Sequence, residues 1–150
     1  MKIFVTVGHT RFDSLFKQID LIRNPEWHFI SQVYDGCYVP ENGDSISFTS
    51  NIHKYFEIAD VVITHAGAGT VYTLLELAKP TIVIANTDRV DSHQEDLLKY
   101  VEDNEFALVC RQLSELEFLI EQFGTFKPKS YVSEPFLAAN EISLMLGLID

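Results

Sequence analysis

The chain has 150 residues, 47% of them apolar, and a formal net charge of −11 at pH 7. This length and composition predict one globular domain with a real core and exclude a disordered chain. The acidic balance argues against a nucleic-acid binder and against docking on anionic membranes. Cys37 and Cys110 form no CxxC pair, and no apolar run approaches the ~20 residues of a membrane span. We therefore expect a reduced, cytoplasmic protein without direct membrane insertion.

Strand patterns alternate with helical patterns along most of the chain. Strands are expected over residues 3–7, 27–33, 45–48, 61–64, 81–85 and 107–109. Helices are expected over residues 12–23, 52–59, 70–78, 92–102 and 113–122. β-Branched runs that alternate with amphipathic helices are typical of a parallel sheet covered on both faces. The pattern predicts an α/β fold with a single Rossmann-like domain over residues 1–150.

The last part of this domain, residues 124–150, is expected to be a connection followed by a terminal helix over residues 136–149. The apolar residues of that helix fall on two stripes, and a helix apolar on two faces needs cover on both. It either packs across its own domain or docks one face on a partner chain.

The most informative segment is Thr64-His65-Ala66-Gly67-Ala68-Gly69-Thr70, which joins the strand ending at residue 64 to the next helix. A helix N-terminus has unpaired N–H groups and the positive end of the helix dipole, which favour a phosphate. The glycines let a ligand approach the backbone, and His65 and Thr70 add side-chain donors. We interpret the segment as the diphosphate grip of a nucleotide-sugar site. A plain strand-to-helix turn is the alternative.

Two further loops follow strand ends and are expected beside this segment, because ligands bind beyond the carboxyl ends of parallel strands. The first is Val7-Gly8-His9-Thr10, where Gly8 offers a second backbone approach to the diphosphate. Thr10 is expected to cap the following helix, which is also the simpler reading of that loop. In the second loop Asn86 follows a strand, and His93 and Gln94 begin a helix from which they could reach sugar hydroxyls. A solvated helix start is the alternative there.

Other chemistries find little support in the sequence. Gly67-x-Gly69 lacks the third glycine or alanine of a dinucleotide fingerprint, because Tyr72 occupies that position. A metal site built from His65, His93 and Asp91 lacks paired ligand spacing. No G-x-S-x-G elbow of a hydrolase is present. We expect neither a metal nor another cofactor.

Taken in order, these motifs resemble the C-terminal domains of family 28 glycosyltransferases. The resemblance covers about residues 1–120 and is strongest to the short, stand-alone Alg13-like and PssE-like subunits. It rests on four segments: Val5 to Leu15, His65 to Thr70, Lys79 to Asn86, and His93-Gln94. The ordered set is far more specific than any one motif.

The resemblance implies the donor-binding half of a GT-B glycosyltransferase, a hexosyltransferase active only with a partner. The implied partner is a membrane-associated Alg14-like or PssD-like chain that binds the acceptor and holds this chain at the membrane periphery. The implied reaction moves a sugar such as GlcNAc, GlcA or Gal from a UDP donor to a lipid-linked acceptor. The diphosphate would be surrounded by Gly8, His65, Gly67, Gly69 and Thr70, with His9, Thr10, Ala66 and Ala68 alongside. His93, Gln94 and Asn86 would face the sugar, and the general base is expected on the partner.

One departure from the family pattern concerns Thr73. Family members usually carry an acidic residue there, eight positions after the motif histidine, which binds the ribose hydroxyls. Threonine offers one hydroxyl where a carboxylate offers two acceptor oxygens. The change predicts altered donor preference or weaker binding. It also leaves open a non-catalytic subunit that stabilises a partner transferase.

Overall fold

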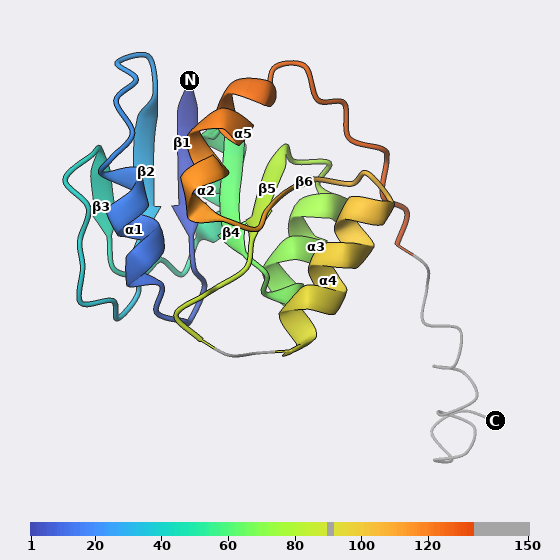
Figure 1. The fold of residues 1–150 in the computed structure, drawn as a ribbon, viewed down its shortest axis with the longest axis horizontal. Coiled ribbons are helices and arrows are strands. Elements are labelled where there is room, and N and C mark those ends of the chain that lie inside the picture. The colour runs from blue at the N-terminus through green and yellow to red at the C-terminus, as the bar shows by residue number, and fades with distance from the viewer. Residues whose placement is uncertain (90–91, 134–150) are drawn as a thin grey trace.

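The computed structural model describes residues 1–89 and 92–133, and these residues form an α/β fold (Figure 1). Its strands are β1 (Lys2–Thr6), β2 (His28–Gln32), β3 (Asp44–Ile46), β4 (Val61–His65), β5 (Thr81–Ile84) and β6 (Leu108–Cys110). Its helices are α1 (Asp13–Ile19), α2 (Ile52–Ile58), α3 (Ala68–Glu76), α4 (Ser92–Asp103) and α5 (Leu116–Gln122), with a 3-10 turn at Leu113–Glu115 before α5. The predicted alternation of strands and helices is confirmed.

The strands form one six-stranded sheet in the order β3-β2-β1-β4-β5-β6, and every pair is parallel. This is the Rossmann order, in which the chain direction across the sheet reverses between β1 and β4. In the register of the sheet, Thr6 at the end of β1 lies between Gln32 of β2 and Thr64 of β4. The loops that follow β1 and β4 therefore diverge to opposite faces, which opens a crevice at the carboxyl edge.

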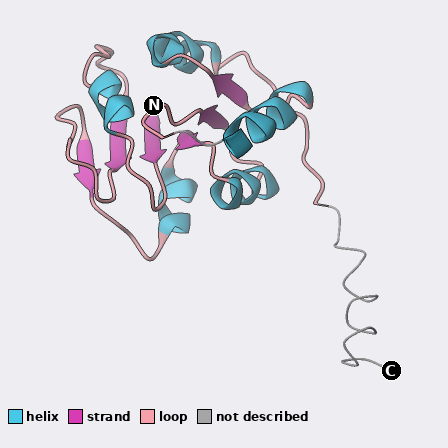
Figure 2. Ribbon diagram, turned by 60° about the horizontal axis from the view of Figure 1, so that its bottom comes forward, coloured by secondary structure: helices cyan, strands magenta, loops and turns pink. Residues whose placement is uncertain are grey.

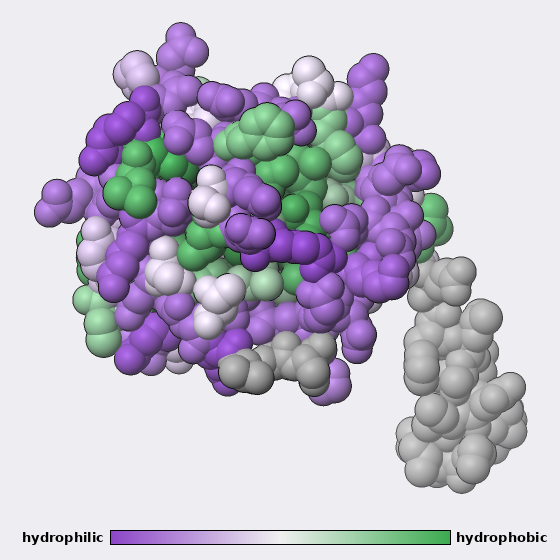
Figure 3. All heavy atoms as spheres, viewed as in Figure 1, coloured by the Kyte–Doolittle hydropathy of each residue, from purple (hydrophilic) through white to green (hydrophobic). Residues whose placement is uncertain are grey.

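Helices cover both faces of the sheet (Figure 2). On one face the largest core cluster includes β1 residues Ile3 and Val5 and residues of α1 and α5. On the other face β1 contributes Phe4, which packs with residues of α2 and α3, while a third cluster joins α3 to α4. This alternation explains the continuous apolar strand patterns, because residues on both faces are buried. Hydrophilic residues cover much of the face seen in Figure 3.

Two helix ends differ from the sequence prediction. Thr10 does not cap α1; instead, Asp88 of the loop after β5 accepts hydrogen bonds from the backbone N–H of Ser14 (3.0 Å) and from its hydroxyl (2.6 Å). At the other end α1 stops at Ile19 rather than at residue 23. The amide of Asn42 donates to the carbonyls of Ile19 (2.9 Å) and Ile22 (3.0 Å), so a distant loop replaces the next helical turn.

The C-terminal region is described as far as residue 133, and the predicted helix over residues 136–149 lies outside the described residues. After α5 the chain crosses to the α3–α4 side, where Lys129 pairs with Glu105 (3.3 Å) and Tyr131 packs edge-on against Phe106. Within the described ranges, none of the helices combines the length and the apolar character that a membrane span requires.

Candidate functional site

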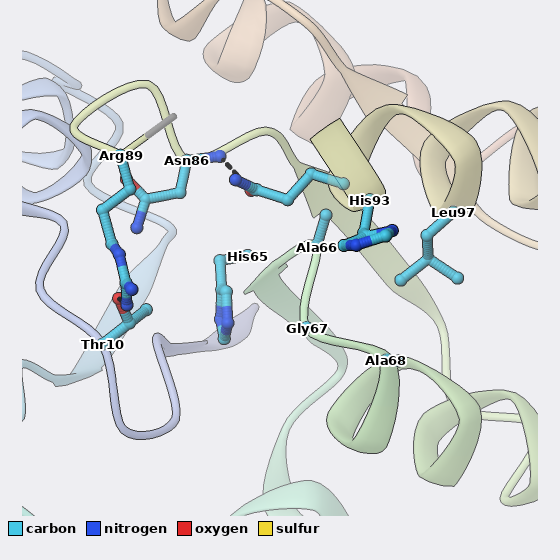
Figure 4. A pocket seen from close by; sticks show the side chains of 10 residues that line it. Thr10, His65, Ala66, Gly67, Ala68, Asn86, Arg89, His93 and Leu97 are labelled. Carbon is cyan, nitrogen blue, oxygen red and sulfur yellow. Dashed lines mark hydrogen bonds between the residues drawn. The ribbon is translucent and has the colours of Figure 1, made fainter. Parts of the chain in front are cut away.

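A cavity of about 270 Å³ lies at the carboxyl edge of the sheet, where the crevice between β1 and β4 opens. Residues from three loops and from the start of two helices line it (Figure 4). They are Thr10, His65, Ala66, Gly67, Ala68, Asn86, Arg89, His93, Gln94 and Leu97. Most of the residues that the sequence singled out therefore surround one cavity. Arg89 is a lining residue that the sequence analysis did not identify.

His65 ends β4 and occupies the middle of the site, between Thr10 and Arg89 on one side and Gly67 on the other (Figure 4). A Cβ atom built on Gly67 would lie 2.5 Å from Nε2 of His65 and 2.7 Å from its Cε1. A Cβ built on Gly8 would lie 3.3 Å from the same Cε1. Glycine at both positions thus leaves room for the imidazole of His65. At position 67 in particular, any larger residue would clash with this ring.

Gly8 is held in a left-handed conformation (φ 58°), which favours glycine. Its N–H donates to Oγ1 of Thr6 (3.3 Å), and its carbonyl accepts from Nε2 of Gln32 (3.2 Å). Thr6 in turn donates to Oε1 of Gln32, and both side chains are buried. Strands β1 and β2 therefore fix this turn through a closed hydrogen-bond network, which sets the position of the backbone that faces His65.

The first turn of α3 offers backbone donors to the cavity. Gly67 is the N-cap residue, and no side chain caps the helix. The N–H of Gly67 is already bound to the carbonyl of His65 (2.7 Å), and intrahelical bonding begins with the N–H of Val71. The N–H groups of residues 68–70 thus have no acceptor within the helix, at an end that no side chain caps. Such an end favours the binding of an anion.

Four hydrogen bonds hold the loop after β5 against the loop after β1 and the start of α1. In addition to the two bonds from Ser14 to Asp88, Nδ2 of Asn86 donates to the carbonyl of Arg11 (2.9 Å), and Arg89 donates to Oγ1 of Thr10 (2.9 Å). These contacts hold the Arg89 guanidinium at the edge of the cavity. One sequence feature points to Arg89: it lies three residues after Asn86, in the loop that follows β5.

Asn86 and Gln94 are nearly buried and bond to the protein rather than lying free for a sugar. Oε1 of Gln94 accepts from the backbone N–H of Asn86 (2.7 Å), and Oδ1 of Asn86 accepts from the N–H of Asp88 (3.0 Å). They form the wall that joins α4 to the β5 loop. His93, in the first turn of α4, is exposed and lines the same cavity.

The electrostatics of the cavity depend on His65 and Arg89. Burial of the imidazole, together with the positive charge of Arg89, lowers the pKa of His65 below its usual value of 6.5. The ring is therefore mainly neutral at pH 7 and acts as a hydrogen-bonding group rather than as a cation. Among the described residues that line the cavity, Arg89 is the only Lys or Arg.

Five predicted site residues lie outside the cavity lining: Gly8, His9, Gly69, Thr70 and Thr73. His9 packs its ring against Tyr34 and Phe48, each at 5.4 Å between centroids, and lines a neighbouring cavity that shares Thr10 and Arg89 with the first. Thr73 donates its hydroxyl proton back to the carbonyl of Gly69 (2.8 Å), so it offers an external ligand only acceptor lone pairs. Gly69 faces open space, with no atom within 4 Å of a built Cβ.

The described residues contain no cluster of three or more His, Cys, Asp or Glu side chains placed to hold a metal ion. His65 and His93 do line one cavity, but Asp91, the third residue considered from the sequence, lies outside the described residues.

Comparison with known proteins identifies the family. The model of the glycosyltransferase family 28 C-terminal domain matches residues 24–131, which include β2 to β6 and most of the cavity. The chain belongs to this family. The resemblance inferred from the ordered motifs is thereby confirmed.

Sequence relatives of this family 28 domain include the mouse UDP-N-acetylglucosamine transferase subunit ALG13, which is 36% identical over 129 residues. That match covers 75% of this chain and 11% of the mouse protein, so the chain spans about a tenth of the length of this curated relative. A transferase of Flavobacterium psychrophilum, named UDP-N-acetylglucosamine--N-acetylmuramyl-(pentapeptide) pyrophosphoryl-undecaprenol N-acetylglucosamine transferase, is 27% identical over 135 residues, which is 83% of this chain and 37% of that protein.

Solved structures confirm the predicted fold. MurG of Acinetobacter baumannii superposes with a TM-score of 0.71 at 16% identity, over 98% of this chain and 49% of that one. The NMR solution structure of ALG13 superposes with a TM-score of 0.59 at 20% identity, over 97% of this chain and 94% of that one. The family 28 domain is thus the counterpart of the C-terminal half of a GT-B glycosyltransferase.

Proposed function

We propose that this chain is the donor-binding and catalytic subunit of a two-component UDP-sugar glycosyltransferase. It transfers a hexosyl group, with GlcNAc as the first candidate, to a lipid-linked acceptor in polysaccharide or lipid-linked oligosaccharide synthesis. The observation that carries the proposal is the cavity at the sheet's switch point, where an uncapped helix end, a caged histidine and an arginine converge. Family membership and the names of the relatives support the same assignment.

The cavity has the donors that a diphosphate requires. Phosphate oxygens accept from the N–H groups of the first turn of α3, the Nε2–H of His65 and the Arg89 guanidinium. Arg89 exchanges its present bond to Thr10 for a charge-assisted bond to the ligand. The sugar extends toward His93 and the wall formed by Asn86 and Gln94.

In the proposed reaction the acceptor hydroxyl attacks the anomeric carbon of the donor sugar, and the bond from that carbon to the β-phosphate oxygen breaks. The electron pair goes to the diphosphate, which leaves as UDP. The α3 N–H groups, His65 and Arg89 face the charge that develops on the diphosphate, and removal of one such fixed donor raises a barrier by about 3–4 kcal/mol. The base that takes the acceptor proton belongs to the partner.

The partner is an acceptor-binding chain of the Alg14-like or PssD-like kind, tethered to a membrane. The mouse relative is named as a transferase subunit, which supports a heteromeric assembly here. Through this partner the chain works at the cytoplasmic face of a membrane.

Calorimetric titration with UDP, UMP and three UDP-sugars (UDP-GlcNAc, UDP-GlcA and UDP-Gal) tests the donor site. We expect UDP to bind more tightly than UMP, and His65→Ala to weaken UDP binding by about tenfold, because a donor to the diphosphate is lost. His28→Gln is the matched control, since His28 pairs with Asp44 on an edge strand outside the cavity. Failure of the native chain to bind any of these ligands at millimolar concentration contradicts the proposal.

A second candidate function, a non-catalytic subunit that stabilises a partner transferase, is favoured by one observation. Thr73 stands where the family usually carries an acidic residue, and its hydroxyl proton is already committed to Gly69. The two functions differ in the reconstituted complex. Loss of transferase activity on His65→Ala, with the complex still assembled, supports the catalytic subunit; full activity in that variant supports the stabilising one.

A further inference from the structure

His65 has a buried ring nitrogen with no hydrogen-bond partner among the residues that the structure describes. We propose that binding of the donor diphosphate is coupled to the uptake of one proton by His65. The inference rests on the proposed function, because it concerns the same site. Under this proposal, the cavity gains a positive charge only when the donor diphosphate binds.

The geometry favours a neutral ring in the free protein. The imidazole lies close to both Gly8 and Gly67, where a Cβ atom would crowd it, and its Nδ1 atom is buried without a partner among the described residues. Protonation would place a second N–H there with no acceptor and beside the charge of Arg89. Burial and Arg89 accordingly lower the pKa of His65.

A bound UDP-sugar reverses the preference of His65 for the neutral form. The diphosphate of a UDP-sugar carries two negative charges, whereas Arg89 carries one positive charge. With the ligand in the cavity the local charge around His65 changes from positive to negative. A negative charge within a few ångströms stabilises the imidazolium, so the pKa of His65 rises on binding and a proton enters from solvent.

The other charged and titratable groups near His65 differ in where they point. In the loop after β1, His9 packs on Tyr34 and Phe48, and Arg11 pairs with Asp35 at 3.5 Å. Both groups line a second cavity, which shares Thr10 and Arg89 with the first, and neither lines the cavity that holds His65.

The remaining elements around the ring add little charge. The first turn of α3 carries none, because its residues are Ala68, Gly69 and Thr70. In the loop after β5, the charged carboxylate of Asp88 binds Ser14 of α1, whereas Arg89 is the charge that acts on the ring. From α4, His93 lines the same cavity. His93 is therefore the second histidine that an experiment must separate from His65.

Calorimetry of the full chain with UDP-GlcNAc near pH 6 and near pH 8 tests the coupling. Both phosphates of this ligand are esterified, so the ligand itself does not titrate in that range, unlike UDP. A group whose pKa rises on binding makes affinity increase as pH falls, by up to about tenfold per pH unit between its two pKa values. We expect tighter binding near pH 6, and a measured enthalpy that changes with the ionisation enthalpy of the buffer.

Three variants identify the residue that takes up the proton. His65→Gln should bind more weakly and lose both the pH dependence and the buffer dependence. His93→Gln should keep both. Arg89→Gln should move the pH dependence to higher pH, because the charge that disfavours the imidazolium in the free protein is gone.

The outcomes separate the two proposals. Equal affinity at both pH values with no buffer dependence overturns the proton coupling and leaves the donor site intact. Persistence of the pH dependence in His65→Gln also overturns it, since the proton then sits elsewhere. If UDP-GlcNAc binds at neither pH, the proposed function is contradicted, and the proton coupling that rests on it is contradicted as well.

Discussion

Replacing Gly67 with alanine tests whether the imidazole of His65 is caged as described. The new Cβ would lie 2.5 Å from Nε2 and 2.7 Å from Cε1, whereas carbon atoms in contact prefer about 3.5–4.0 Å. The ring must therefore move by about 1 Å, and Gly8 also lies close to it, since a Cβ built there would be 3.3 Å from the same Cε1. The φ of Gly67 is −95°, so the backbone itself accepts alanine.

Overpacking of this kind costs about 1–3 kcal/mol. We expect Gly67→Ala to lower the free energy of unfolding by ~1–2 kcal/mol in urea denaturation and to weaken donor binding, because His65 is displaced. Gly69→Ala is the matched control, since nothing lies within 4 Å of its Cβ. In a helix that change should leave stability equal or raise it by up to about 1 kcal/mol.

A double-mutant cycle isolates the contact. In the His65→Ala background the ring is absent, so Gly67→Ala should cost nothing, which gives a coupling of about 1–2 kcal/mol. An equal loss of stability from Gly67→Ala in both backgrounds would refute the reasoning, because the strain would then lie in the backbone and not against the imidazole.

Three further predictions concern the loop after β5 and the cysteines. Arg89→Gln should weaken UDP binding by about tenfold and reduce its salt dependence, whereas Arg89→Lys keeps the charge and should recover part of the affinity; calorimetry at two salt concentrations measures both. Asp88→Ala removes the acceptor of the Ser14 N–H in the first turn of α1 and should lower the free energy of unfolding by about 1 kcal/mol in urea denaturation. Lys99→Ala, which removes an exposed ion pair with Asp103 within α4, should lower it by less. Burial raises the pKa of the Cys110 thiol to about 11, so only Cys37 should react with a thiol reagent near pH 8 until the protein is denatured.

The sequence predicted the sheet well because the information is local. Continuous apolar runs indicate strands buried on both faces, and amphipathic runs indicate the helices that cover them. The core clusters follow this pattern, with Ile3 and Val5 on one face and Phe4 on the other. The strand order was not predicted, since pairing between distant strands leaves no local pattern.

Within the site, the strand-to-helix turn was also predictable, because His65, Gly67 and Ala68 are adjacent in sequence. What sequence reasoning missed depends on contacts between distant segments. Arg89 bonds to Thr10 across 79 positions, and Asp88 bonds to Ser14 across 74. A capping residue predicted from neighbours alone was therefore wrong, and the arginine at the cavity edge was overlooked.

The charge of the site bears on turnover as well as on binding. A chain with net charge −11 repels anions at long range, so a diphosphate must be held by short-range donors. One fixed cation, Arg89, and a neutral His65 provide less attraction in the free cavity than two permanent cations would. Charge that His65 acquires with the ligand increases as negative charge builds on the leaving diphosphate, which favours the transition state over the ground state. UDP carries more negative charge than the UDP-sugar, so His65 keeps its proton until UDP leaves, and the proton then returns to solvent.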